Sequence, residues 1–376
     1  MDTRAGGDLP ASGRFGRRSA WLSGGGDKVK MSRRMQTALA ALVLVLATAC
    51  SLSTSQPRQS ASGAPEKASL KMGVGGQTQI VYLPLTLADG LGYFKDEGIS
   101  VEVDDLRAGP DALKAMLGGS VDMVTGAYED TIRAQLQGTS IEMFTTLDVS
   151  PGLVLMVGKQ HQDQVKSIKD LAGHPVGVTS EGSSTDEMVR YLLKQNSMAA
   201  DAVPVVAIGS GYTAIDAITS GQVWAGAMVE PAASQAERSA TGRALYDTRT
   251  AQGTHQVFGG SWPAAGFYAS SEFAKQNPRS VRAIARAGVR SLKYIKSHSA
   301  SDIANHLPSS FFANGDKPAF VDMLQKNLGT FSDTGLMPPD GPNDVLETLK
   351  AADTKTDWST VALNKTYDNG FVQKAG

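Results

Sequence analysis

Short apolar runs alternate with helical patterns through the middle of the 376-residue chain. Leu70 to Val74 is predicted as a buried strand, and Leu83, Leu87 and Leu91 then recur four residues apart on one face of a helix. Further strands are predicted at 100–103, 121–125, 141–147, 153–157, 175–179, 203–207, 223–228 and 264–269, and further helices at 110–118, 128–137, 184–195, 212–219 and 231–240. Strands that alternate with helices predict β-α-β units and mostly parallel sheets, so the fold class is α/β.

The pattern becomes wholly helical after the last of these strands. Asn277 and Pro278 have the residue types of an N-cap and an N1 proline, and they are predicted to open a long helix. Val281, Ile284 and Leu292 mark the face of this helix that should be buried. The chain is therefore expected to end in a helical tail.

The length of the chain predicts two lobes, because single domains usually contain about 100 to 200 residues. An interrupted first lobe and an inserted second lobe would require two crossover segments between them. The expected boundaries are 68–150 plus 255–376 for the first lobe and 151–254 for the second.

The first fifty residues have the layout of an export signal. Basic residues from Lys28 to Arg34 precede a charge-free apolar run at 38–47, and small residues follow before Cys50. The run is shorter than the roughly 20 residues that a permanent membrane span needs. Residues 1–50 are therefore expected to be a leader and a signal peptide, with Met31 as a candidate start.

Cys50 is the candidate site of lipid attachment. Ala47 to Cys50 resembles the bacterial lipobox, in which the cysteine is acylated and becomes the new N-terminus. The alternative is an ordinary signal that is cleaved after Ala49, which would leave Cys50 as a free thiol. Residues 51–67 are rich in Ser, Gln, Pro, Ala and Gly, a composition that predicts a flexible tether between the membrane and the folded lobes.

Charge and cysteine content exclude several classes of protein. Lysine plus arginine (36) nearly balances aspartate plus glutamate (37), so the chain lacks the basic surplus expected of a nucleic-acid partner. A single cysteine excludes intrachain disulfides and multi-thiolate metal sites. The five histidines have no metal-ligand spacing, so no metal site is expected. No cofactor is assigned either.

Six short segments occur in an order that resembles one family of proteins. They are Tyr82–Leu85, Gly92–Ile99, Leu117–Asp122, Ile168–Gly173, Val176–Ser183 and Gly221–Pro231. Together they resemble the nitrate/sulfonate/taurine group of periplasmic solute-binding proteins, which also includes binders of the pyrimidine precursors of thiamine. The resemblance spans roughly residues 70 to 300, and it implies a type II periplasmic-binding-protein fold, a small-molecule solute and a partner permease of an ABC importer in the cytoplasmic membrane.

A ligand of such a fold is expected at the carboxyl ends of the strands, where loops and helix N-termini converge. The candidate contacts are the polar and aromatic side chains predicted in those loops. They are Gln77, Gln79, Tyr82, Tyr128, Glu129, Ser183, Ser184, Thr185, Glu230 and Trp262.

Two of these positions predict opposite ligand charges. The stretch Ser183 to Thr185 opens a helix, so its N–H groups and hydroxyls could hold an oxyanion. Alternatively, Ser184 and Glu187 form a capping box that satisfies the same donors. Glu129 either caps a helix or faces the cleft, and in the cleft it would favour a ligand with N–H donors or positive charge.

Glu230 and Trp262 also have two interpretations each. Glu230 precedes Pro231, so a hinge or capping role competes with ligand contact. Trp262 could stack on a planar ligand or simply cover the wall of the cleft.

Taken together, these observations predict a non-catalytic, lipid-anchored extracytoplasmic solute-binding protein of an ABC importer, present as a monomer. The expected ligand is a small organic molecule of the sulfonate, nitrate or pyrimidine-like class. The alternatives are an enzyme of the same fold acting on a pyrimidine-like substrate, and a periplasmic sensor or adaptor. No nucleophile-base pattern is visible in the sequence, so no catalytic residue is assigned.

Overall fold

Two five-stranded sheets organise the part of the chain that the computed structural model describes, which comprises residues 63–106, 108–312 and 315–374. The predicted signal peptide, Cys50 and nearly all of the predicted tether lie outside these residues. Among the described helices, none combines the length and the apolar character needed to cross a membrane.

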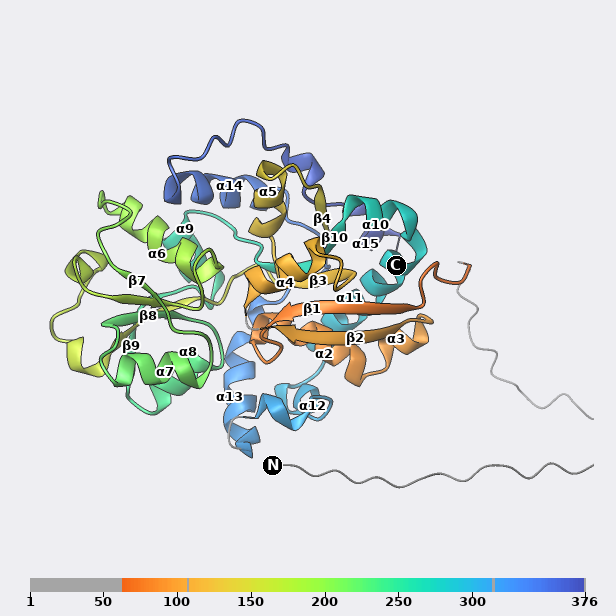
Figure 1. The fold of residues 1–376 in the computed structure, drawn as a ribbon. Helices are drawn as coiled ribbons and strands as arrows, with labels where there is room; N and C mark the ends of the chain where they lie inside the picture. The colour runs from red at the N-terminus through yellow and green to blue at the C-terminus, as the bar shows by residue number, and fades with distance from the viewer. Residues whose placement is uncertain (1–62, 107, 313–314, 375–376) are drawn as a thin grey trace, which may run out of the picture. The chain divides into compact units, whose positions relative to one another are not determined.

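The first sheet has the strand order β2-β1-β3-β10-β4 (Figure 1). Its strands are β1 (Ser69–Gly75), β2 (Ser100–Leu106), β3 (Met123–Ala127), β4 (Ile141–Thr146) and β10 (Ala265–Ser270). β1 runs parallel to β2 and β3, whereas β10 is antiparallel to both β3 and β4. The fourth place in this sheet is therefore filled by β10, which follows all strands of the second sheet in the chain.

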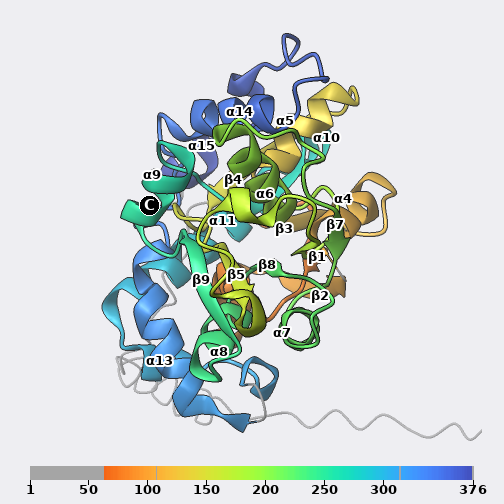
Figure 2. The same cartoon turned by 90° about the vertical axis from the view of Figure 1, so that its left-hand side faces the viewer.

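The second sheet repeats this order as β7-β6-β8-β5-β9 (Figure 2). Its strands are β5 (Val154–Gly158), β6 (Val176–Val178), β7 (Val205–Ala207), β8 (Ala225–Met228) and β9 (Gly242–Asp247). β6 is parallel to β7 and β8, and β5 is antiparallel to β8 and β9. The chain passes between the sheets twice, once from β4 to β5 and once from β9 to β10, so the expected type II periplasmic-binding-protein fold is confirmed.

The principal helices alternate with the strands and then fill the C-terminal part of the described chain. They are α2 (Leu83–Gly90), α3 (Tyr93–Asp96), α4 (Gly109–Leu117), α5 (Glu129–Leu136), α6 (Ser184–Gln195), α7 (Tyr212–Thr219), α8 (Ala232–Arg238), α9 (Ala251–Phe258), α10 (Ser271–Gln276), α11 (Pro278–Ser297), α12 (Ala300–Ala304), α13 (Lys317–Asn327), α14 (Gly341–Ala352) and α15 (Gly370–Gln373). The bounds of α6 and α7 are those that the sequence pattern predicts.

The long helix α11 begins at Pro278, as predicted, but its first turn is capped differently. Asn277 makes no capping hydrogen bond through its side chain. Instead, Glu66 Oε2 accepts hydrogen bonds from the backbone N–H groups of Arg279 (2.9 Å) and Ser280 (3.0 Å). A carboxylate at a helix N-terminus also interacts favourably with the helix dipole. This contact therefore ties the start of the described chain to α11.

Three hydrophobic clusters lie beneath the helices. The first joins α2 and α11 to the first sheet, and the third packs α7 and α8 against the second sheet. The second cluster includes Val124 and Tyr268 of the first sheet, Leu155 of the second, and side chains of α6 and α14. Figure 2 shows α14 close to α5 and α6, and residue contacts join α14 to both helices. The C-terminal segment therefore packs on α6 as well as on elements of the first sheet.

Candidate functional site

A cleft lies where strand ends of the two sheets face each other. It contains about 690 Å³ of space not filled by atoms, counting its open mouth. From the first sheet it is lined by Gly75 at the end of β1, by 108–110 after β2 and by Glu129 and Asp130 after β3. From the second sheet it is lined by Thr179 and 182–185 after β6, by Ser210 after β7 and by Val229 after β8. Both halves of the fold therefore contribute loops to one site.

Six of the ten predicted contact residues line this cleft. They are Gln79, Tyr82, Glu129, Ser183, Ser184 and Thr185. The other four are not among the lining residues, and they are Gln77, Tyr128, Glu230 and Trp262. Ligand contact by any of the ten stays a prediction, but their surroundings differ in ways that bear on it.

Glu129 and Asp130 bring two carboxyl groups to the cleft from the first turn of α5. Glu129 is 1% exposed and Asp130 is 6% exposed. Glu129 Oε1 accepts a short hydrogen bond from the Ser184 hydroxyl, which belongs to the second half of the fold, while Glu129 Oε2 has no hydrogen-bond partner. Asp130 Oδ2 accepts a hydrogen bond of 2.9 Å from the Tyr268 hydroxyl. Hydrogen bonds therefore hold both carboxyl groups in place, and Glu129 Oε2 remains available to accept a hydrogen bond.

Burial raises the pKa values of these acids. Loss of solvent, together with the charge of Asp130, raises the pKa of Glu129 to about 7, although the Ser184 hydroxyl and Arg133 act in the opposite direction. Burial raises the pKa of Asp130 to about 6, against the stabilising effects of Tyr268 and Arg133. Burial, together with the charge of Glu129, also holds the pKa of Asp148 well above its usual range. Near neutral pH, Glu129 and Asp130 are therefore close to the pH at which each gains or loses its proton.

The N-terminus of α6 contains a compact group of hydroxyls. The side-chain oxygens of Thr179, Ser183 and Thr185 lie 2.8 to 2.9 Å from one another. Ser183 also donates to the Ser180 carbonyl oxygen at 2.7 Å, and Thr185 accepts from the Thr179 N–H at 2.8 Å. These hydroxyls satisfy one another, so a ligand would have to displace existing bonds to use them.

The capping box expected at Ser184 and Glu187 is wrong. The N-cap residue is Ser183, and its side chain makes no capping hydrogen bond. Ser184 donates to Glu129, and Glu187 is paired with Arg133 on α5. Both partners lie far away in sequence, and contact with them diverts the two side chains from the local pairing. Thus α5 and α6, which belong to different halves of the fold, are joined by one hydrogen bond and one ion pair.

The residues that follow β1 divide between the cleft and the interior. Gln79 lines the cleft, and its side-chain N–H donates to the Gly75 carbonyl oxygen at 2.6 Å. Gln77 donates instead to the Thr86 hydroxyl at 2.9 Å, so its amide is directed toward α2. Tyr82 lines the cleft, and burial near Asp130 and Glu129 raises the pKa of its phenol.

Tyr128 and Trp262 are core residues. Tyr128 is fully buried, and its hydroxyl lies 2.5 Å from that of Thr366. Trp262 is 1% exposed and packs edge-on against Phe258, with ring centroids 3.6 Å apart. Of the two earlier interpretations of Trp262, its surroundings fit a packing role in the second hydrophobic cluster.

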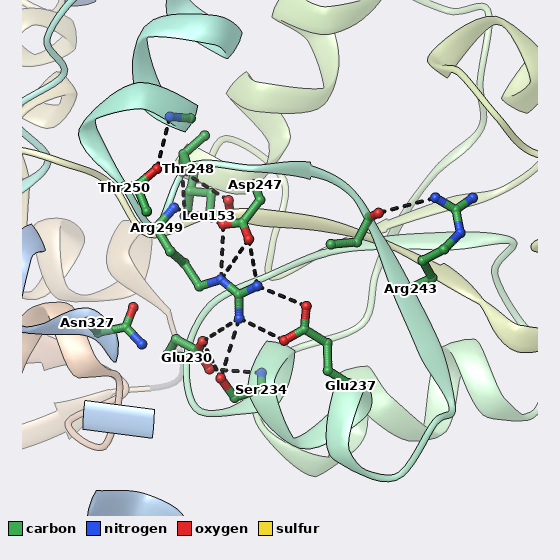
Figure 3. Close-up of polar contacts among 12 residues, drawn as sticks. Leu153, Glu230, Ser234, Glu237, Arg243, Asp247, Thr248, Arg249, Thr250 and Asn327 are labelled. Atoms are coloured by element: carbon green, nitrogen blue, oxygen red, sulfur yellow. Dashed lines mark hydrogen bonds and ion pairs between the residues drawn. The ribbon is translucent and has the colours of Figure 1, made fainter. Parts of the chain in front are cut away.

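Glu230 belongs to a charged cluster that surrounds Arg249 (Figure 3). Its carboxylate is fully buried and accepts hydrogen bonds from the Ser234 N–H (2.9 Å), the Ser234 hydroxyl (2.6 Å) and Arg249 Nη1 (3.0 Å). Arg249 also pairs with Glu237 at 2.9 Å and Asp247 at 2.6 Å. Burial opposes its charge, but the bonds to Asp247 and Glu237 raise the pKa of Arg249 further above its usual range.

The backbone of Glu230 joins the two halves of the fold. Its carbonyl oxygen accepts a hydrogen bond of 3.3 Å from the N–H of Ile80, the first residue of the short 3-10 helix Ile80–Tyr82 after β1. The charged cluster therefore anchors the loop after β8, which carries the lining residue Val229. This arrangement fits the structural role that was considered for Glu230.

Several residues that line the cleft are not among the predicted contacts, although their positions after strand ends could have indicated them. Asp130 follows Glu129 directly in the first turn of α5, but only Glu129 is among the predicted contacts. Gly109, Pro110 and Ser210 follow the ends of β2 and β7. The rule that ligands bind beyond the carboxyl ends of strands would have selected all of them. Among the described residues, no cluster of three or more histidine, cysteine, aspartate or glutamate side chains could hold a metal ion.

Comparison with solved structures supports the fold. A protein of Bordetella bronchiseptica RB50 is 34% identical, with a TM-score of 0.80 over 83% of this chain and 98% of that one. The periplasmic nitrate-binding protein NrtA of Synechocystis PCC 6803 is 14% identical, with a TM-score of 0.65 over 83% and 89%. The alkanesulfonate-binding protein SsuA of Xanthomonas axonopodis pv. citri, solved with MOPS, is 17% identical, with a TM-score of 0.61 over 84% and 99%.

Sequence comparison identifies the family. YtlA of Bacillus subtilis (strain 168), which carries the name of a binding protein, is 23% identical over 242 residues, or 62% of this chain and 68% of that protein. The family model described as NMT1/THI5 like matches residues 79–301, which is more than half of the chain. The chain therefore belongs to the NMT1/THI5-like family and has the periplasmic-binding-protein fold of the nitrate- and sulfonate-binding proteins.

Proposed function

We propose that this protein is an extracytoplasmic solute-binding protein of an ABC importer, which holds a small organic molecule in the cleft and presents it to a membrane permease. The observation that carries the proposal is the composition of the cleft wall. Loops after β1, β2 and β3 of one sheet face loops after β6, β7 and β8 of the other. A ligand between them would contact both halves and favour their closed arrangement, which is the form that a permease can distinguish.

Family membership and the named relatives support a binding role. NrtA is named for nitrate and SsuA for alkanesulfonates, and both share the fold. The proposed contacts in this chain are the cleft-lining members of the predicted set, above all Glu129, Tyr82 and the segment 183–185. Gln77, Tyr128, Glu230 and Trp262 are assigned supporting roles, because their polar groups or rings are engaged elsewhere or are buried away from the lining.

A thermal-shift screen of the purified protein tests the binding function. A ligand that binds only the folded protein stabilises it by RT ln(1 + [L]/Kd), or about 2.7 kcal/mol at a hundredfold excess over Kd. The screen should include sulfonates, nitrate, pyrimidines, amines and amidines. A saturable shift confirmed by calorimetry supports the proposal, and no response to any of these classes at millimolar concentration counts against it.

Lipid anchoring through Cys50 is part of the same proposal. A flexible segment between Cys50 and Glu66, the residue that caps α11, would hold the binding domain near its permease and so raise the effective concentration of each protein for the other. Metabolic labelling with an alkyne-tagged fatty acid should mark the wild-type protein, and Cys50→Ser should abolish the label and release the protein from the membrane fraction. A labelled Cys50→Ser protein would refute acylation at this residue.

A further inference from the structure

The wall of the cleft is acidic. Glu129 and Asp130 both line it and are almost fully buried. Asp148 has no exposed surface, accepts a hydrogen bond from the N–H of the lining residue Ala265, and interacts electrostatically with Glu129. No lysine, arginine or histidine is present among the described residues that line the cleft. Arg133 on α5 offsets part of their charge, but it is itself paired with Glu187 and does not line the cleft. In a site of low dielectric constant, carboxylates in the wall disfavour an anionic solute and attract a cationic one.

The position where an oxyanion would be expected is occupied by the protein itself. The first residue of the twelve-residue helix α6, Ser184, donates its hydroxyl to Glu129 Oε1. A carboxylate from α5 therefore already lies at the N-terminus of α6, where the helix dipole favours negative charge. The neighbouring hydroxyls of Ser183 and Thr185 are engaged with Thr179 and with each other. A nitrate or sulfonate entering this position would have to displace Glu129.

The second oxygen of Glu129 is the unsatisfied group in the wall. Oε2 is buried, and none of the described residues donates a hydrogen bond to it. A buried acceptor without a donor costs about 1 to 3 kcal/mol, and more when it carries charge. Among the bonds of the described residues, Asp130 uses only Oδ2, which accepts from Tyr268. A solute that donates N–H hydrogen bonds to these two carboxyl groups would remove the free-energy cost of the unsatisfied acceptor.

We propose that the solute of this cleft carries a cationic N–H group, of the ammonium, amidinium or guanidinium type, which donates to Glu129 Oε2 and is neutralised by the Glu129 and Asp130 pair. This inference rests on the proposed binding function and names its ligand chemistry. In this proposal, Glu129 determines whether the cleft binds cations or oxyanions.

Binding of such a group is coupled to the release of a proton. The groups that face Glu129 are Asp130 and Arg133 on α5, Glu187 on α6, Asp148 after β4, and the phenols of Tyr82 and Tyr268. With the pKa of Glu129 at about 7, the free protein carries a proton there in a large fraction of molecules at neutral pH. A cation binds the ionised form, so its affinity should rise with pH, by up to about tenfold per pH unit below 7, and level off above it.

Isothermal titration of the purified protein with two sets of probes tests the inference. The cations are benzamidine, agmatine and putrescine, and the oxyanions are nitrate, methanesulfonate and taurine. Glu129→Gln keeps the size of the side chain and removes its charge. The matched control is Glu181→Gln, because Glu181 is an exposed carboxylate in the loop that leads into α6 but does not line the cleft.

The expected result is that at least one cation binds and that no oxyanion does. Glu129→Gln should then weaken the cation roughly 10- to 150-fold, the effect of losing one charge-assisted hydrogen bond. Glu181→Gln should leave the affinity unchanged, and titrations in buffers of different ionisation enthalpy should show proton release near pH 6.5.

Two results would overturn the inference and leave the binding function standing. The first is saturable binding of nitrate or a sulfonate without binding of any cation, and Arg107→Ala then tests whether the residue before Ala108 in the sequence supplies the positive charge. The second is cation binding that is unchanged in Glu129→Gln. If no probe of either set binds and the wider thermal-shift screen is also negative, the inference and the proposed function both fail.

Discussion

Replacing Arg249 by methionine should destabilise the protein strongly, because it leaves a buried charge without its cation. Glu230 has no exposed surface and receives one bond from Arg249 and two from Ser234. In Arg249→Met the two bonds from Ser234 remain, but the carboxylate stays buried and uncompensated. Loss of one partner from a buried pair typically costs about 3 to 5 kcal/mol. At roughly 2 to 4 °C per kcal/mol for domains of 150 to 250 residues, Tm should fall by about 10 °C.

Urea unfolding followed by circular dichroism and by tryptophan fluorescence measures the effect, with Glu237→Gln and Asp247→Asn as controls. The side chains of Glu237 and Asp247 are 36% and 38% exposed, so each control should cost no more than about 1 kcal/mol. The double variant Arg249→Met, Glu230→Gln should recover a large part of the loss, because no buried charge then remains. A loss below about 1 kcal/mol in Arg249→Met, or no recovery in the double variant, would refute the reasoning.

Three further predictions concern the cleft and its support. Without ligand, the protein should be about 3 kcal/mol more stable at pH 5 than at pH 8 on account of Glu129, whose pKa of about 7 is raised from 4.5. This stability is present at low pH and is lost as pH rises through 7. Burial raises the pKa values of Asp130 and Glu187 in the same direction, so Glu129→Gln should remove only the contribution of Glu129 from the pH dependence of the urea midpoint. Gly75→Ala would place a Cβ 2.2 Å from the backbone nitrogen of Gly109. It should therefore lower the free energy of unfolding by at least about 1 to 3 kcal/mol and weaken solute binding as measured by calorimetry. Tyr128→Phe removes the hydrogen bond between the hydroxyls of Tyr128 and Thr366. It should therefore lower the free energy of unfolding in urea by about 1 kcal/mol and leave the solute affinity unchanged.

The elements that the sequence predicts best are those with strong apolar periodicity. The bounds of α6 and α7 are the same in the prediction and in the structure, and the two crossovers follow from the order of the elements. By contrast, β9 and α9 were not predicted. β9 has mostly half-buried residues and therefore no clear alternation, and α9 is a short helix with Gly253 in its first turn. Elements with weak patterns depend on tertiary contacts that the local sequence does not reveal.

The capping and pairing partners could not be predicted, because they lie far apart in the sequence. Glu66 caps α11, and Ser184 bonds to Glu129. Local pairing rules consider only residues within one helical turn, so they predicted a capping box where a contact between the two halves of the fold exists. For the same reason, the sequence identified Glu129 as a candidate without indicating which of its oxygens would be free.

The place of β10 in the first sheet constrains the order in which the protein can be assembled. β3 and β4 do not pair with each other, and residues 265–270 fill the gap between them. All strands of the second sheet, 154–247, precede β10 in the chain, so that sheet can form while the first still lacks the strand that joins β3 to β4. Unpaired edges of this kind promote association with other chains. The sheet whose first strands are synthesised first is thus completed last, and the edges of β3 and β4 stay open to association with other chains until β10 has been made.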